Sequence, residues 1–321
     1  MNIEELKIED LDAENFVKQQ VEAISSAVSD GLAINALSGG VDSSVVTLIA
    51  HRALGDRLKT YFIDSGLMRE GEPQYIASIF KRLGVEVEII DAQEEFLGAL
   101  KGKTDPEEKR EAITQSFYAI VFSRLAKESG ANHVFQGTNY TDIEETVAGI
   151  KRQHNIIVQL GIDPEKEYGY KIIEPLIQIR KPAIRIIGEV LGLPEELYNR
   201  PPFPGPALAA RVIGEVSPER VKIVRKATVI VEAELDHSDA FQYLAILHND
   251  RVTGIRDGKR DYGLQIEVRC WDSEDAKTGS PTRLSFDILD RLAQRITTEV
   301  PGVVSVTYNI TQKPPSTIEA I

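Results

Sequence analysis

The sequence predicts an α/β protein in which a parallel sheet, covered by helices on both faces, precedes a small α+β domain. The first two-thirds of the 321 residues alternate between short apolar runs, typical of buried strands, and segments with helical periodicity. Strands that alternate with helices form right-handed βαβ units and hence a parallel sheet. The alternation stops at residues 201–206, where four of the six residues are proline. Because such a stretch is rigid and extended, we expect one domain over residues 1–200 and a second over 207–321.

The spacing of apolar residues predicts the helices and strands of the first domain. Val17, Val21, Ile24 and Val28 are spaced by three or four residues and predict an amphipathic helix. Apolar and β-branched runs predict strands at 32–37, 58–63, 85–90 and 133–135. Helices are expected at 43–54, 72–83, 106–128 and 184–191. In such a sheet a ligand binds outside the carboxyl ends of the strands, where the strand order reverses.

The second domain has fewer and more widely spaced elements. Helical periodicity predicts helices over 218–234 and 288–299. Strand-like runs cover 241–247, 262–269 and 303–310. This mixture is typical of a small α+β domain.

Composition excludes several classes of protein. The chain has 42% apolar and 27% charged residues, as ordinary globular proteins do. Its net charge of −13 argues against nucleic acid as a partner, because phosphate neutralisation needs a basic surface. No apolar run approaches the roughly 18 residues of a membrane span, and residues 1–5 lack the pattern of a secretory signal. We therefore expect a cytoplasmic protein with neither a membrane nor nucleic acid as partner.

The single cysteine limits the chemistry further. With Cys270 alone, the chain forms no internal disulfide and no four-cysteine metal site. Cys270 lies in a predicted strand without the surroundings of a nucleophile, so we expect it in the core. The five histidines show no metal-ligand spacing, and we expect structural roles for them, with His154 the one reserved case.

The strongest chemical signal is the heptapeptide Ser-Gly-Gly-Val-Asp-Ser-Ser at residues 38–44, between a predicted strand and a predicted helix. Two glycines let the backbone turn sharply and approach an anion closely. The following residues open a helix whose free N–H groups and dipole favour negative charge. Three hydroxyls add donors. Because no Gly-Lys-Ser/Thr ending is present, a lysine that reaches the phosphates must come from elsewhere in the sequence.

This heptapeptide resembles the signature of the ATP pyrophosphatases, the PP-loop enzymes. The resemblance implies that ATP is cleaved between its α- and β-phosphates with the help of Mg²⁺. An acceptor oxygen is adenylated, the loop holds pyrophosphate, and a nucleophile then displaces AMP.

Further motifs resemble those of GMP synthetases and occur in that family's order. They are Phe-Ile-Asp-Ser-Gly-Leu at 62–67, Gln-Gly-Thr at 136–138 with Asp142 and Glu144, Pro-Phe-Pro-Gly-Pro at 202–206 and Lys-Pro-Pro-Ser-Thr-Ile-Glu at 313–319. The chain therefore resembles the ATP pyrophosphatase subunit of two-subunit, archaeal-type GMP synthetases. That resemblance implies an adenine nucleotide α-hydrolase-like domain followed by a dimerisation and acceptor-binding domain.

The resemblance also implies a reaction and its partners. The C2 oxygen of xanthosine 5′-monophosphate (xanthylate) is adenylated and then displaced by ammonia, which gives GMP, AMP and pyrophosphate. Such an enzyme is a ligase that forms a C–N bond. A glutaminase needs a nucleophilic cysteine with a histidine base, and this chain lacks that arrangement, so ammonia comes from a separate glutaminase subunit or from solution. A homodimer is expected.

The site residues that the resemblance implies fall into four groups. Those assigned to catalysis are Lys181, Asp42 and Ser43. Those assigned to ATP and pyrophosphate are Ser38, Gly39, Gly40, Val41, Asp42, Ser43, Ser44, Asp64, Gly137 and Thr138. Those assigned to xanthylate are Arg200, Gln242, Arg260, Lys313, Ile318 and Glu319. Asp42 and Asp142 are assigned to the metal.

Some positions depart from the family pattern. Pro182-Ala183 follow Lys181 where the family has Asp-Glu, and residues 151–157 replace a histidine and a glycine pair of the family's lid. Residues 254–260 and the ending Ala320-Ile321 also differ. Two alternatives therefore stay open: an adenylating enzyme with another nucleotide or carbonyl acceptor, and a catalytically silent paralogue that binds nucleotide.

Overall fold

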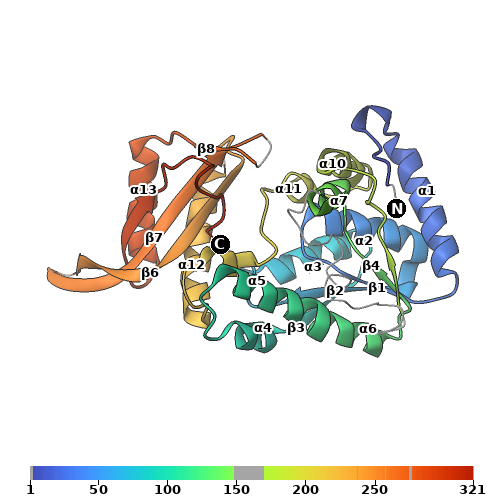
Figure 1. Ribbon diagram of the computed structural model, residues 1–321, viewed down its shortest axis with the longest axis horizontal. Coiled ribbons are helices and arrows are strands. Elements are labelled where there is room, and N and C mark those ends of the chain that lie inside the picture. The colour runs from blue at the N-terminus through green and yellow to red at the C-terminus, as the bar shows by residue number, and fades with distance from the viewer. Residues whose placement is uncertain (1–2, 148–169, 237, 257, 275–276, 321) are drawn as a thin grey trace. The chain divides into compact units, whose positions relative to one another are not determined.

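The computed structural model describes residues 3–147, 170–236, 238–256, 258–274 and 277–320 (Figure 1). The chain forms two compact units. The first comprises residues 1–64, 72–92 and 114–200, and the second comprises 65–71, 93–113 and 201–321. The second unit thus includes two segments that lie between elements of the first in the sequence. The contiguous domain ranges 1–200 and 207–321 stay a prediction.

The first unit is built on a five-stranded sheet in the order β3-β2-β1-β4-β5. All neighbouring strands are parallel, which confirms the predicted α/β class. From β1 the chain proceeds through β2 to β3 on one side, and β4 and β5 extend the sheet on the other. The order therefore reverses between β1 and β4, and the loop after β1 starts at this point. The strands are β1 (Ala33–Ala36), β2 (Leu58–Asp64), β3 (Val87–Asp91), β4 (His133–Phe135) and β5 (Lys171–Ile173).

The helices predicted over the first 200 residues agree with the observed ones within a few residues, whereas the helices at 140–147 and 195–198 were not predicted. The helix predicted over 106–128 is continuous from Pro106 to Ser129, but residues 116–122 have wider π-helical geometry. No helix in the described part of the chain is long and apolar enough to cross a membrane. The α-helices are α1 (Ala13–Val28), α2 (Val41–Leu54), α3 (Glu72–Arg82), α6 (Ser123–Ser129), α7 (Tyr140–Val147), α10 (Lys181–Val190) and α11 (Glu195–Tyr198).

A buried chain of hydrogen bonds joins β2, β1 and α2. Thr60 donates to the side-chain oxygen of Asn35 (2.8 Å), and the amide of Asn35 donates to the hydroxyl of Thr47 (2.6 Å). Thr47 donates in turn to the main-chain oxygen of Ser43 (2.7 Å). The three linking side chains are at most 3% exposed. Because buried polar groups must be paired, these bonds fix α2 against the sheet at its N-terminal end.

The second unit contains a long antiparallel hairpin, β6 (Gln242–Arg256) and β7 (Lys259–Asp272). β9 (Val303–Tyr308) lies parallel to β7, β8 (Ser280–Pro281) is antiparallel to it, and α12 (Pro218–Leu235) packs on β6. The hairpin strands are longer than predicted, because their outer halves are exposed and lack the apolar runs of a buried strand. The other helices are α4 (Gln93–Leu100), α5 (Pro106–Gln115), α13 (Phe286–Glu299) and the 3₁₀ helix η4 (Ala207–Arg211).

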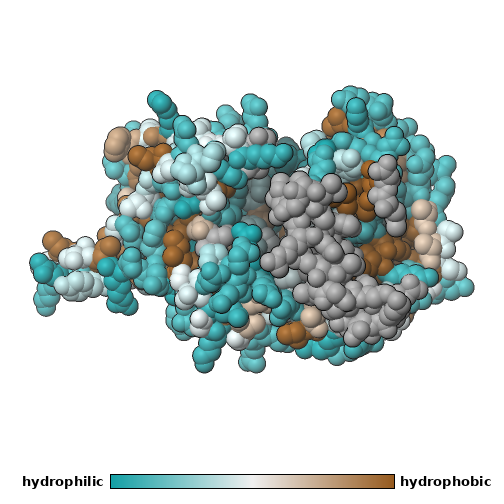
Figure 2. Space-filling view, viewed as in Figure 1, coloured by the Kyte–Doolittle hydropathy of each residue, from teal (hydrophilic) through white to brown (hydrophobic). Residues whose placement is uncertain are grey.

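The outer end of this hairpin exposes apolar side chains. Figure 2 shows hydrophobic residues there, among hydrophilic ones. Ile255 is 81% exposed and Tyr262 is 58% exposed. The glycines Gly254 and Gly263 are their neighbours on the two strands, and a Cβ at either would come within 2.7 Å of Val304. The face of the hairpin that carries the two glycines therefore packs closely on β9, and the face that carries Ile255 and Tyr262 is exposed.

Replacing Asn35 by alanine is expected to lower the free energy of unfolding by about 1–3 kcal/mol, because Thr60 loses a buried hydrogen-bond acceptor. Urea unfolding followed by circular dichroism measures the change. Asn199→Ala is the matched control, since Asn199 is exposed and its side chain bonds to Glu195 in the preceding turn. Equal unfolding midpoints for Asn35→Ala and Asn199→Ala would contradict the role given to Asn35.

Candidate active site

The loop Ser38–Ser44 connects β1 to α2 and forms the centre of the candidate site. Gly40 is the residue before the first turn of α2, and Gly39 has φ +78°, which side chains rarely adopt. A Cβ at Gly39 would also lie 3.2 Å from the side chain of Ile76. The positive φ therefore favours glycine at 39, and a Cβ there would also be tightly packed. The N–H groups of the first turn of α2 have no partners within the helix, so this end favours an anion.

Hydrogen bonds of two serine hydroxyls connect the beginning of the loop to its end. The hydroxyls of Ser38 and Ser43 are 2.9 Å apart, and Ser43 also donates to the carbonyl oxygen of Gly40 (3.1 Å). The main-chain N–H of Gly40 donates to Ser38 (3.3 Å). Ser44 differs from the expectation of three available hydroxyls, because it is fully buried in α2. The loop therefore offers an anion the hydroxyls of Ser38 and Ser43, beside main-chain N–H groups.

The segment after β4 forms a second side of the site. A Cβ at Gly137 would lie 3.3 Å from both the Cβ of Asp42 and the main-chain nitrogen of Ser43, so glycine allows this close approach. The amide of Asn139 donates to Asp42 (3.2 Å), and the main-chain N–H of Asn139 donates to Asp142 (3.0 Å). The predicted residues Gly137, Asp42 and Asp142 are thus brought together. Asn139, which joins the two carboxylates, was not predicted.

These two carboxylates suit a Mg²⁺ ion that also binds substrate. Mg²⁺ prefers oxygen ligands and is usually held by one or two carboxylates together with substrate phosphates and water. Asp42 and Asp142 supply such oxygens beside the N-terminal end of α2. Among the described residues, no group of three or more His, Cys, Asp or Glu side chains could hold a metal by itself. The residues therefore fit a metal that arrives with a phosphate ligand, rather than a closed protein site.

A buried ion pair forms a third side. Glu72, the first residue of α3, is 3% exposed and accepts from the guanidinium of Arg200 at 2.6 Å. The same carboxylate oxygen lies 3.4 Å from the position that a Cβ would occupy at Gly39. Arg200, predicted for the acceptor, is therefore held next to the loop Ser38–Ser44. Sequence reasoning missed Glu72, although an acidic residue at the first position of a predicted helix is an ordinary N-terminal signal.

Lys181, Asp64 and Thr138 lie on elements that meet this edge of the sheet. Lys181 is exposed at the first position of α10, a helix that packs against α2. Asp64 ends β2, and Thr138 follows β4 and donates to Glu174. Arg180, just before Lys181, is bonded to Glu5 and Glu144. The hydrogen bonds to Glu144 and Glu5 raise the pKa of Arg180, so its charge is permanent and fixes the start of α10.

In the second unit, Gln242, Ile318 and Glu319 come together. The amide of Gln242 donates to the carboxylate of Glu319 at 2.7 Å, and Ile318 is 7% exposed. Lys313 exchanges main-chain hydrogen bonds with Gly279. Arg211, which sequence reasoning missed, is 1% exposed and donates twice to Glu319 at 3.2 Å.

Arg260 does not join this group within the same chain. Gln242 is paired with Trp271 at the base of the hairpin, whereas Arg260 is paired with Ile255 near the tip. Arg260 and Trp271 are 11 residues apart on one strand, which corresponds to roughly 36 Å at about 3.3 Å per residue. The acceptor residues assigned to the second unit thus lie in two separate places.

Two remaining predictions concern other residues. Cys270 is buried, as expected, and burial raises the pKa of its thiol. The predicted lid at 151–157, with His154, lies outside the described residues.

Two family profiles and several relatives of nearly full length match this chain. The family profile described as "GMP synthase C terminal domain" matches residues 229–320, and that described as "Asparagine synthase" matches 22–139. A protein from Archaeoglobus fulgidus, named as a subunit of GMP synthase (glutamine-hydrolyzing), is 49% identical over 96% of this chain and 99% of its own. The subunit of the same name from Pyrococcus furiosus is 45% identical over 95% of this chain and 97% of its own.

A third relative is longer. The Aeropyrum pernix protein named GMP synthase (glutamine-hydrolyzing) is 44% identical over 95% of this chain, but the match covers 60% of its own length. The similarity to the Archaeoglobus and Pyrococcus subunits, by contrast, spans both chains almost completely. The chain therefore belongs to the same family as these GMP synthase (glutamine-hydrolyzing) subunits.

Proposed function

We propose that this protein is the synthetase subunit of a GMP synthase and catalyses the ATP-dependent amination of xanthylate to GMP. The observation that carries the proposal is the loop Ser38–Ser44 at the start of α2, located where the strand order of the sheet reverses. A lysine-free loop of this kind suits pyrophosphate as a leaving group. The near-complete similarity to the archaeal GMP synthase subunits supports xanthylate as the acceptor.

The chemistry has two steps. In the first, the C2 oxygen of xanthylate attacks the α-phosphorus of ATP, and the bond to the β-phosphate breaks. Pyrophosphate stays with the main-chain N–H groups of α2 and the hydroxyls of Ser38 and Ser43, and Lys181 neutralises its charge. In the second, ammonia attacks C2, and AMP departs with the oxygen. Asp42 and Asp142 would hold Mg²⁺, which supplies charge neutralisation of the phosphates when bound.

The residues that the resemblance implied for xanthylate remain proposed for the acceptor. Arg200, held by Glu72, supplies a cation suited to the xanthylate phosphate. Gln242, Ile318 and Glu319 offer an amide, an apolar side chain and a carboxylate, which suit a purine with N–H donors and carbonyl oxygens. Lys313 adds a second cation.

The remaining predicted residues of the first unit are proposed for ATP. Asp64 ends β2, and Gly137 and Thr138 follow β4, so all three lie at the carboxyl edge of the sheet. Ligands of such sheets bind along this edge.

Ammonia comes from a separate glutaminase subunit. The buried Cys270 is unsuited to act as a nucleophile. The longer Aeropyrum pernix relative supports this proposal, because the region similar to this chain is only part of a protein named as glutamine-hydrolyzing. A cytoplasmic location suits such a biosynthetic enzyme.

The enzyme is proposed to act as a homodimer formed through the second unit. The exposed apolar residues at the hairpin tip support a protein contact there. Arg260 lies too far from Gln242 of its own chain to share one ligand with it. In a two-fold symmetric dimer each hairpin can reach its partner, so Arg260 would serve the acceptor site of the second copy.

With ATP, Mg²⁺, xanthylate and ammonium, the protein is expected to form GMP, AMP and pyrophosphate in equal amounts. Lys181→Met should lower kcat about 100-fold, because the departing pyrophosphate loses a fixed cation. Product chromatography measures the ratio of the products, and a pyrophosphate assay measures kcat. Lys59→Met, an exposed lysine on β2, is the control and should keep full activity. Release of ADP, or AMP formation independent of xanthylate, would refute the proposal.

Mixed dimers test the role of Arg260. Arg260→Ala and Glu319→Ala chains should each be inactive alone, but co-expression should recover about a quarter of wild-type activity, since half of the dimers carry one intact site of two. Arg260→Ala mixed with the double variant Arg260→Ala/Glu319→Ala is the control and should stay inactive. No recovery in the first mixture would show that Arg260 does not act on the partner.

A further inference from the structure

Three of the six residues proposed to bind the acceptor, Lys313, Ile318 and Glu319, lie on a tail with little regular structure. From Asn309 onward the described chain has neither helix nor strand, apart from the bridge between Lys313 and Gly279. Ile318 and Glu319 lie on this tail. Because a segment without helix or strand makes few regular hydrogen bonds of its own, other groups must hold it in place.

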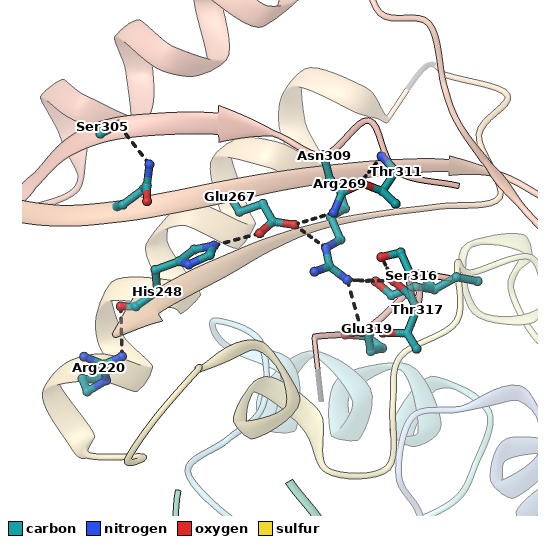
Figure 3. A network of polar contacts seen from close by, with 12 residues as sticks. Arg220, His248, Glu267, Arg269, Ser305, Asn309, Thr311, Ser316, Thr317 and Glu319 are labelled. Atoms are coloured by element: carbon teal, nitrogen blue, oxygen red, sulfur yellow. Dashed lines mark hydrogen bonds and ion pairs between the residues drawn. The ribbon is translucent and has the colours of Figure 1, made fainter. Parts of the chain in front are cut away.

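Arg269 on β7 supplies the main attachment (Figure 3). One nitrogen of its guanidinium, Nη1, donates to three successive tail carbonyls, those of Thr317 (2.7 Å), Ile318 (3.2 Å) and Glu319 (3.3 Å). Arg269 is 9% exposed. A buried guanidinium thus replaces the ladder of hydrogen bonds that a strand would have given these carbonyls.

Arg269 is itself fixed by a carboxylate on the same strand. Its Nε donates to Glu267, which also receives hydrogen bonds from His248 (2.8 Å) and Asn309 (3.0 Å) (Figure 3). Burial raises the pKa of Glu267, but the hydrogen bonds from His248, Asn309 and Arg269 outweigh this effect and lower the pKa to about 2. Glu267 therefore stays charged and holds the guanidinium toward the tail.

A second buried arginine holds the end of the tail through its side chain. Arg211, in η4, donates through Nε and Nη2 to the two oxygens of Glu319, both at 3.2 Å. Its guanidinium also lies 4.8 Å from the ring centre of Phe203. The carboxylate of Glu319 is thus oriented before any ligand binds, which lowers the entropy lost on binding.

We infer that Arg269 and Arg211 are positioning residues that dock the C-terminal tail and so set the affinity for the nucleotide acceptor. The inference rests on the proposed function in one respect, the assignment of the tail to the acceptor. Docking and binding are linked: a ligand that needs the docked tail binds more weakly in proportion to the fraction of molecules in which the tail is undocked.

The fluorescence of Trp271 can report whether the tail is docked. Trp271 is the single tryptophan and is 1% exposed. It forms a buried cluster with Leu244, Ile246 and Ile318 of the tail. If the tail leaves, Trp271 loses the cover of Ile318, so its emission should move to longer wavelength and be quenched more readily by acrylamide.

Arg269→Met in the full chain tests the inference, because methionine keeps an apolar stem and removes every donor. Without ligands, the Trp271 emission should shift toward that of a chain truncated after Ser316. The KM for xanthylate should rise about 10- to 100-fold, as for the loss of hydrogen bonds to a charged group, while the KM for ATP stays within about twofold. Saturating xanthylate should restore both kcat and the original emission, since the ligand redocks the tail.

Two matched variants separate docking from general stability. Arg291→Met removes the exposed ion pair with Glu234 in the same unit and should change neither emission nor KM. Arg269→Lys keeps the charge without the forked geometry and should give an intermediate emission shift and an intermediate KM. If Arg269→Met does not fold, Arg269→Lys serves as the test variant in its place.

The outcomes are distinguishable from failure of the proposed function. Unchanged Trp271 emission in Arg269→Met and Arg269→Lys would overturn the inference whatever the acceptor is. An emission shift accompanied by an equal rise in the KM for ATP would overturn the acceptor-specific part, because it would indicate general damage. An emission shift in a protein that makes no GMP would support docking by Arg269 and refute the function assigned to the tail.

Discussion

The close approach of two backbone segments at one edge of the parallel sheet is the constraint on which the candidate active site depends. Gly39 bends the loop after β1 with a positive φ, and Gly137 lets the segment after β4 come against the first turn of α2. A Cβ at Gly137 would lie 3.3 Å from Asp42 and from the nitrogen of Ser43 and would push these two segments apart. A Cβ at Gly39 would instead lie 3.2 Å from the side chain of Ile76 in α3. The two glycines thus help to bring the N–H groups of α2, the two serine hydroxyls and the carboxylates of Asp42 and Asp142 to one edge.

Buried polar groups, rather than apolar packing alone, give the two units their specific geometry. In the first unit, Asn35 connects Thr60 of β2 to Thr47 of α2, so the helix that carries the loop cannot slide along the sheet without leaving hydrogen bonds unmade. In the second, Arg269 and Arg211 fix the tail. In both units, paired buried polar groups hold a segment that has been proposed to bind a ligand. Such fully satisfied networks are rigid.

The sequence indicated the loop at 38–44 and the alternation of helices and strands, because both signals lie within short stretches of the chain. It did not indicate Glu72 beside Gly39, Asn139 against Asp42, or Arg211 against Glu319, since each of these pairs is separated by tens of residues or more and depends on how the chain returns. The strand β5 and the outer halves of β6 and β7 were missed for a related reason. They are very short or exposed, and their pairing rather than their composition makes them strands.

Taken alone, the sequence determined the α/β class, the position of the loop Ser38–Ser44 between a strand and a helix, and the likeness to a family, because these depend on periodicity and on contiguous motifs. Only the tertiary structure decided which of the predicted residues meet. It placed Arg200 at the loop through Glu72, gathered Gln242, Ile318 and Glu319, and separated Arg260 from them along a hairpin. The physical reason is that strand register and the burial of distant segments join residues that lie far apart in the chain. The local amino-acid composition around each residue says almost nothing about such contacts.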